Sequence, residues 1–271
     1  MHTVITHRSE DGGTEPSLPD LLELDEVDRD RYRSTAVIGT SRPLYGGQVA
    51  AQALKAAGLT VPPERVPHSL HGYYLRRGDS TQPISYQVER DRDGRSYSAR
   101  RIEAVQQGAV IFSMAASFHV PEDSPEMQSD SPLSDVDEPA NSPIFGLSRL
   151  VSMDFRVPEQ PFSKAAWPTR LWARCTAKIS ATPLENACVL TYLSDMSSGL
   201  TPLHTRVWRT PASLDHAVWF HHIVPLDNWV LLDLVPHRVA SGRGWYTGAV
   251  WSVDGVHSAS LAQEMLFRAS R

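Results

Sequence analysis

The sequence predicts an α+β fold in which one unit, a central helix followed by an antiparallel meander of strands, occurs twice in tandem. Three observations lead to this prediction. An acidic, proline-rich stretch divides the 271-residue chain, the two sides contain the same kinds of element in the same order, and matched positions keep a nearly constant spacing. A repeated unit of this kind is typical of a sheet that packs around a helix.

Residues 121–143 have the composition of a linker. They contain five prolines, five serines and seven acidic residues, with almost no side chain to bury. Such a segment does not offset the entropy lost on ordering, so the boundary between two folded units belongs here. We expect an acidic N-terminal tail over residues 1–20, an N-terminal repeat over 21–120, the linker over 121–143, and a C-terminal repeat over 144–271.

The two sides of the linker predict the same order of elements. Before it, a helix over 48–57 follows Gly46-Gly47, and after it a helix over 184–195 follows Pro183. An extended segment comes next on each side, over 69–75 and over 212–220. Three strands then follow on each side, with Gly-containing turns between them. They cover 84–89, 96–105 and 109–120 in the first half, and 229–235, 245–251 and 256–267 in the second.

The spacing between matched positions indicates a tandem duplication. Ser69 and Ser213 are 144 residues apart, Gly94 and Gly242 are 148 apart, and Gly108 and Gly255 are 147 apart. The second helix, ENACVLTYLSDM, has apolar residues on nearly all sides, as expected of a helix enclosed by its own sheet. These features together predict a double hotdog fold.

Composition excludes several classes of protein. Hydrophobic residues make up 41% and charged residues 21% of the chain, which is typical of a globular protein. The uncharged stretch over 108–121 is shorter than the roughly 20 residues that a membrane-spanning helix needs, so we expect no membrane span. The N-terminus resembles neither a secretory signal nor a transit peptide, and Cys175 and Cys188 are too few for a disulfide framework. We therefore expect a cytoplasmic protein.

Charge is unevenly distributed along the chain. Residues 1–30 and residues 121–143 each carry a net charge of −7, so the rest of the chain carries +9 within a total of −5. A basic body suits a small anionic ligand. Because no run of Lys or Arg occurs, we expect no nucleic-acid partner.

Four segments carry a resemblance to a known family. They are LYGGQVAAQAL over 44–54, HSLHGYYLRRGD over 68–79, DGRSYSARRIEAVQQGAVIFSMAASF over 93–118, and ASLDHAVWFH over 212–221. Their order and spacing resemble the acyl-CoA thioesterase II family, TesB type. The resemblance implies a double hotdog that hydrolyses the thioester of fatty acyl-CoA, with no cofactor or metal, and that assembles as a homo-oligomer, a dimer or a tetramer.

The resemblance also implies a catalytic constellation in the C-terminal repeat. The family has an Asp at the end of the second central helix, a Thr or Ser before the DHxxWFH segment, and a Gln in the last strand. These positions are Asp195, Ser213 and Gln263 in this sequence. Asp195 is expected to act as the general base on a water molecule, with Ser213 and Gln263 holding that water. The change from Thr to Ser keeps the hydroxyl but loses the methyl group that restricts its rotamer.

Several alternatives compete with this interpretation. Ser213 could act as a nucleophile with His216 as its base, but no Gly-x-Ser-x-Gly elbow is present. The histidines at 204, 216, 221 and 222 lack a metal-binding spacing such as HExxH. An enoyl-CoA hydratase would use Asp195 with His204, yet these are nine residues apart where its motif has five. A non-catalytic acyl-CoA-binding double hotdog is a further alternative.

Two sets of residues are candidates for ligand contacts, and the sequence does not decide among their members. Arginines could meet the phosphates of CoA, and tryptophans of the C-terminal repeat could line an acyl tunnel or fill the core. The arginines are Arg76, Arg77, Arg90, Arg92, Arg95, Arg100 and Arg101, and the tryptophans are Trp219, Trp229, Trp245 and Trp251.

Overall fold

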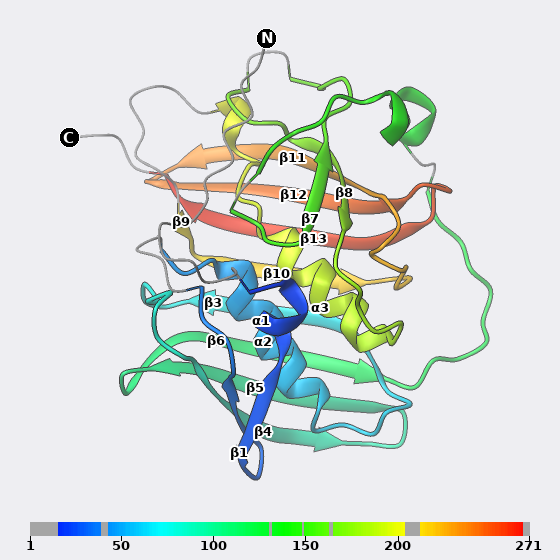
Figure 1. The fold of residues 1–271 in the computed structure, drawn as a ribbon. Coiled ribbons are helices and arrows are strands. Elements are labelled where there is room, and N and C mark those ends of the chain that lie inside the picture. The colour runs from blue at the N-terminus through cyan, green and yellow to red at the C-terminus, as the bar shows by residue number, and fades with distance from the viewer. Residues whose placement is uncertain are drawn as a thin grey trace.

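A computed structural model describes residues 16–38, 43–129, 132–147, 149–162, 165–203 and 212–267. These residues form one thirteen-stranded antiparallel sheet and two long helices, which lie side by side (Figure 1). The helices are α1 (Leu18–Leu22), α2 (Gly46–Gly58) and α3 (Pro183–Ser194), with 3-10 turns at Pro132–Asp135, Pro139–Asn141 and Thr201–Leu203. None of the helices in this described part is both long and apolar enough to cross a membrane.

The first six strands belong to the N-terminal repeat and the other seven to the C-terminal repeat. The former are β1 (Leu24–Asp28), β2 (Arg31–Ser34), β3 (Val66–Tyr74), β4 (Ser85–Asp93), β5 (Tyr97–Gln106) and β6 (Ala109–His119). The latter are β7 (Met153–Arg156), β8 (Arg170–Cys175), β9 (Ala212–Ser213), β10 (Asp215–Phe220), β11 (Val230–Ala240), β12 (Arg243–Ser252) and β13 (His257–Leu266).

The strand order makes the internal duplication visible. It runs β1-β2-β4-β5-β6-β3 in one half and β10-β13-β12-β11-β8-β7 in the other, and β3 pairs with β10 where the halves join. At this join Gly72 pairs with His216. These two are 144 residues apart, the same spacing as Ser69 and Ser213. Matched residues therefore face each other at the centre of the sheet, as expected of a local twofold axis.

The two long helices run side by side in opposite directions under the sheet. A Cβ added at Gly46, at the start of α2, would overlap the side chain of Asp195, at the end of α3. A Cβ at Gly58, at the end of α2, would overlap Leu184 at the start of α3. Every residue of α3 from Asn186 to Ser194 is buried, so the prediction of an enclosed helix is confirmed. Thr182 caps this helix by accepting the N–H of Glu185.

Local turn chemistry accounts for the hairpins that the sequence predicted. Gln107 and Gly108 both have positive φ between β5 and β6, and Ser241 and Gly242 both have positive φ between β11 and β12. Two consecutive residues of this kind form the turn whose twist suits an antiparallel hairpin. The two turns lie between non-equivalent pairs of strands, so each repeat uses this kind of turn at a different hairpin.

Some segments for which the sequence predicted no helix or strand also pack against the rest of the fold. Leu18, Leu21 and Leu22 of α1 are buried against the core. In the 121–143 segment, the indole of Trp172 donates to the carbonyl of Asp137 at 2.8 Å. The side chain of Gln128 bonds to the backbone of the turn before β13. Strands β1, β2, β7 and β8 were also not predicted.

Candidate active site

Asp195, Ser213 and Gln263 meet in one hydrogen-bonded triangle. The hydroxyl of Ser213 donates to Oδ1 of Asp195 at 2.8 Å. The amide nitrogen of Gln263 donates to the same oxygen at 2.6 Å and to Oγ of Ser213 at 2.6 Å. Asp195 is 2% exposed and Gln263 is fully buried. Residues as much as 68 positions apart thus form one compact polar cluster.

Three elements place these side chains. Asp195 is the residue at which α3 ends. The short strand β9 pairs with β13, and Ser213 lies opposite Met265, two residues beyond Gln263. Successive side chains of a strand point to opposite faces, so residues two apart share a face. Gln263 therefore shares the inner face of β13 with the buried residues Leu261 and Met265.

The second carboxylate oxygen of Asp195 has a different environment. From the described residues, Oδ2 accepts one long hydrogen bond, 3.4 Å, from the hydroxyl of Tyr74. It lies against the first turn of α2, because a Cβ on Gly46 would overlap it. The first N–H groups of a helix have no acceptor within the helix, and the N-cap residue Tyr45 makes no side-chain cap. Oδ2 therefore lies beside backbone donors at the positive end of a helix.

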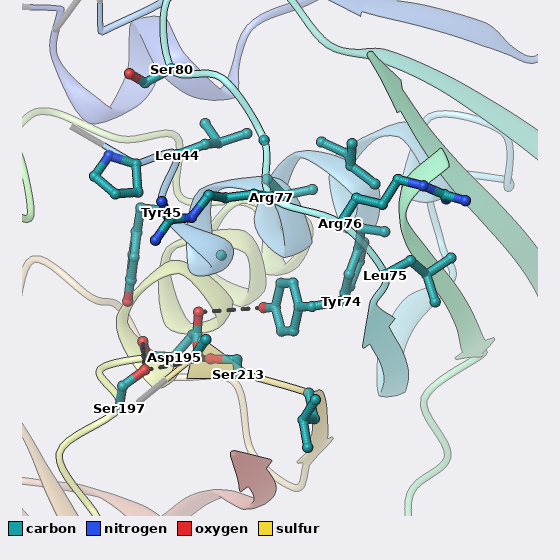
Figure 2. A pocket seen from close by; sticks show the side chains of 18 of the residues that line it. Leu44, Tyr45, Tyr74, Leu75, Arg76, Arg77, Ser80, Asp195, Ser197 and Ser213 are labelled. Atoms are coloured by element: carbon teal, nitrogen blue, oxygen red, sulfur yellow. Dashed lines mark hydrogen bonds between the residues drawn. The ribbon is translucent and has the colours of Figure 1, made fainter. Parts of the chain in front are cut away.

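A cavity of about 730 Å³ opens beside this oxygen. Asp195, Ser213 and Ser197 lie close together in it, and Arg77 extends toward Tyr45 (Figure 2). Most of the described lining is apolar, and the cations among the described lining residues are the side chains of Arg76, Arg77 and Arg149. The cavity thus combines an apolar wall, positive charge and one reactive polar cluster.

Comparison with known proteins agrees with this geometry. Residues 38–119 match the acyl-CoA thioesterase N-terminal domain and residues 121–267 the acyl-CoA thioesterase C-terminal domain. Acyl-CoA thioesterase 2 of Haemophilus influenzae is 33% identical over 92% of this chain and 96% of its own. Acyl-coenzyme A thioesterase 8 of Mus musculus is 34% identical, over 92% and 88%. The crystal structure of acyl-CoA thioesterase II TesB2 from Mycobacterium marinum has a TM-score of 0.77 and 34% identity, over 93% and 96%.

The chain belongs to the acyl-CoA thioesterase II family, TesB type. It is a thioester hydrolase that acts on acyl-CoA, and its fold is the double hotdog, as the sequence predicted.

Two tyrosines of this thioesterase site could not be predicted from the sequence. Tyr74 lines the cavity and bonds to Asp195, and Tyr246 donates from behind to the amide oxygen of Gln263 at 2.8 Å. Burial, and after it the charge of Asp195, raises the pKa of both tyrosines well above the ordinary value. Both hydroxyls therefore keep their protons at neutral pH. Tyr74 belongs to a segment that carried the family resemblance, but nothing in its spacing indicated a contact with Asp195.

His216 is not paired with Ser213. Its Nε2 lies 2.7 Å from Oγ of Ser194, on the last turn of α3, and burial lowers the pKa of this imidazole. The hydroxyl of Ser213 instead donates to Asp195, so the geometry does not favour a Ser-His nucleophile. His204, the partner in the hydratase alternative, lies outside the described residues. Within the described ranges, no group of three or more His, Cys, Asp or Glu side chains could hold a metal ion.

The structure also shows which of the arginine and tryptophan candidates line the cavity. Of the seven arginines, only Arg76 and Arg77 line the cavity, and Arg149, which was not among them, lines it as well. Three others are engaged by carboxylates: Arg90 by Asp30, Arg100 by Asp93, and Arg101 by Glu89 and Asp91. None of the four tryptophans is among the residues that line the cavity.

Proposed function

We propose that this thioesterase hydrolyses acyl-CoA by direct attack of a water molecule that Asp195 deprotonates. The observation that carries the proposal is the asymmetry of the Asp195 carboxylate. Oδ1 is occupied by two short hydrogen bonds, whereas Oδ2 lies at the cavity with one long contact. A carboxylate fixed through one oxygen leaves the other free to accept a proton.

Ser213 and Gln263 take different parts in this scheme. Gln263 donates both amide hydrogens, one to Asp195 and one to Ser213, so it has no donor left for water. The hydroxyl of Ser213 donates to Asp195 and accepts from Gln263, which leaves it one lone pair, with the hydroxyl of Ser197 3.5 Å away. A water that donates to Oδ2 of Asp195 and to Oγ of Ser213 would turn its own lone pair toward the thioester carbon. Gln263 would then orient the other two residues and not hold the water itself.

The negative charge that develops on the thioester oxygen also needs donors. The first N–H groups of α2, beside Gly46, have no acceptor within the helix and are placed to supply them. The hydroxyl of Tyr74 lies at the same point and keeps its proton. The thiolate of CoA is a good leaving group, so no strong general acid is required.

The remainder of the cavity suits the remainder of the substrate. Arg77 and Arg149 make no salt bridge within the described residues, and we assign them to the phosphates of CoA. Arg76 is held by the carbonyl of Val110 at 2.6 Å. The apolar wall around Leu44 and Phe112 would take the acyl chain.

A panel of acyl-CoA substrates of graded chain length tests the activity. A thiol reagent reports each CoA released, and binding is measured in parallel by calorimetry. We expect turnover that varies with chain length, with equal amounts of free acid and CoA. Tight binding of every acyl-CoA without release of thiol would instead support the non-catalytic binder.

We also propose that the enzyme works in the cytoplasm as a homo-oligomer, a dimer or a tetramer. Tyr73 on β3 and Trp219 on β10 are 63% and 39% exposed near the middle of the sheet, where a second copy could cover them. Both Cys175 and Cys188 are buried free thiols, which suits a reducing compartment. Light scattering at micromolar concentration should give a multiple of the monomer mass, and a monomer would refute the assembly.

A further inference from the structure

Tyr246 lies behind the catalytic triangle and does not line the cavity. It is fully buried on the inner face of β12, where it is the cross-strand neighbour of Gln263 on β13. Its ring packs closely on the segment after Asp195, because a Cβ added at Gly199 would overlap that ring. The position of the phenol is therefore fixed both by the sheet and by the segment that carries the catalytic carboxylate.

The Tyr246 hydroxyl completes a directed chain of hydrogen bonds. It donates to Oε1 of Gln263 at 2.8 Å, and Nε2 of Gln263 donates to both Asp195 and Ser213. The carboxamide thus has all of its hydrogens and its oxygen engaged in one orientation. In the flipped orientation its oxygen would face the carboxylate of Asp195, and two acceptors would oppose each other.

We propose that Tyr246 is a positioning residue for thioester hydrolysis, which holds the Gln263 carboxamide so that both amide hydrogens reach Asp195 and Ser213. This inference rests on the proposed roles of those three residues. Without the phenol hydroxyl, the buried oxygen of Gln263 would lose the short hydrogen bond that Tyr246 donates. An unsatisfied buried acceptor is costly, so the amide would move to find another partner and would release the carboxylate.

The primary test is Tyr246→Phe, which keeps the ring and removes only the hydroxyl. We expect kcat to fall about 10-fold with KM for acyl-CoA within about twofold, because the residue does not line the cavity. Unchanged kcat in a folded Tyr246→Phe enzyme would overturn the inference.

The chain offers a matched control in its N-terminal repeat. The hydroxyl of Tyr86, also fully buried, donates to Oε1 of Gln52 at 2.7 Å, and the amide of Gln52 donates to the carbonyl of Leu21. Neither Tyr86 nor Gln52 lines the cavity. Tyr86→Phe removes the same kind of bond, so we expect a similar fall in Tm but wild-type kcat. An equal loss of kcat in the control would mean that general loosening, and not amide orientation, explains the Tyr246 result.

A double-mutant cycle separates this inference from the function on which it rests. In a Gln263→Met background, adding Tyr246→Phe should cost less than twofold in kcat, because the amide that the phenol orients is gone. This double variant replaces both partners of the bond with apolar groups, so it remains usable even if Tyr246→Phe alone folds poorly. A further 10-fold loss in the double variant would refute the inference. Full activity of Gln263→Met would refute the proposed site itself.

Discussion

Asp195→Asn changes the proposed base with little change in shape. The asparagine oxygen can still accept from Ser213 and Gln263, which both donate to Oδ1 in the wild type. Its amide nitrogen would then occupy the position of Oδ2, beside the start of α2. Because the swap is nearly isosteric and keeps both bonds to Oδ1, the variant should fold, but it presents a donor where the wild type presents the proton acceptor.

The expected loss of rate follows from the contacts that change. Loss of a positioned general base costs typically 10²- to 10⁴-fold in rate. At about 1.36 kcal/mol for each factor of ten, the lower limit corresponds to ~2.7 kcal/mol in the barrier. The two bonds to Oδ1 become neutral instead of charge-assisted, which loosens the triangle further. The cost to folding should be smaller, because a buried amide is easier to desolvate than a buried carboxylate.

Steady-state release of CoA, followed with a thiol reagent, measures the effect, and thermal unfolding confirms that the variant is folded. Asp233→Asn is a suitable control. Asp233 also receives two hydrogen bonds, from Arg170 at 3.1 and 2.8 Å, but the pair does not line the cavity. We expect kcat to fall at least about 100-fold for Asp195→Asn and to stay near wild type for Asp233→Asn. Turnover of Asp195→Asn within a factor of about three of wild type would refute the assignment of the base.

Three further predictions follow from the site and its surroundings. Ser213→Ala should raise the activation barrier of hydrolysis by about 2–4 kcal/mol, whereas Ser213→Thr should keep most of the activity because it keeps the hydroxyl. A fully active Ser213→Ala enzyme would argue against the role of the serine. Gly46→Ala should lower kcat more than 10-fold, because its Cβ would overlap Oδ2 of Asp195 and lie 2.8 Å from the Tyr74 ring. Gly146→Ala, with no atom within 4 Å of the added Cβ, is the control, and equal kcat in the two variants would contradict the prediction. Tm should fall as pH is lowered from 7 to 5, because burial holds the pKa of His216 below its ordinary value, so the unfolded chain takes up the proton first. His216→Gln should flatten the dependence of Tm on pH, and a pH-independent wild-type Tm would contradict the prediction.

Local signals in the sequence account for most of the fold. The helices, the strands after them and the Gly-containing turns were predicted because each has a local pattern of propensity or periodicity. Strands β1 and β2, LDEVD and RYRS, were not predicted because they carry so many charges that no apolar alternation is visible. Their pairing is supplied by the rest of the sheet, through β4.

The site could be predicted only in part. The family resemblance supplied Asp195, Ser213 and Gln263, but the adjacent polar residues Gln263 and Glu264 do not by themselves indicate which of the two faces inward. Two consecutive residues of β13, Ser258 and Ala259, are both buried, so simple alternation from the start of the strand fails. Contacts such as those of Tyr246 depend on strand register, which no local pattern specifies.

The central claim is that water attacks the thioester directly, without an acyl-enzyme. Rapid-quench measurement of the first turnover tests it most directly, with CoA and free fatty acid quantified in the same samples and the quenched enzyme weighed by intact-mass spectrometry. Direct attack predicts that acid and CoA appear together, with no burst and no change in the mass of the enzyme. A burst of CoA ahead of the acid, equal to the number of sites and matched by an acyl adduct on Ser213 or Asp195, would contradict it.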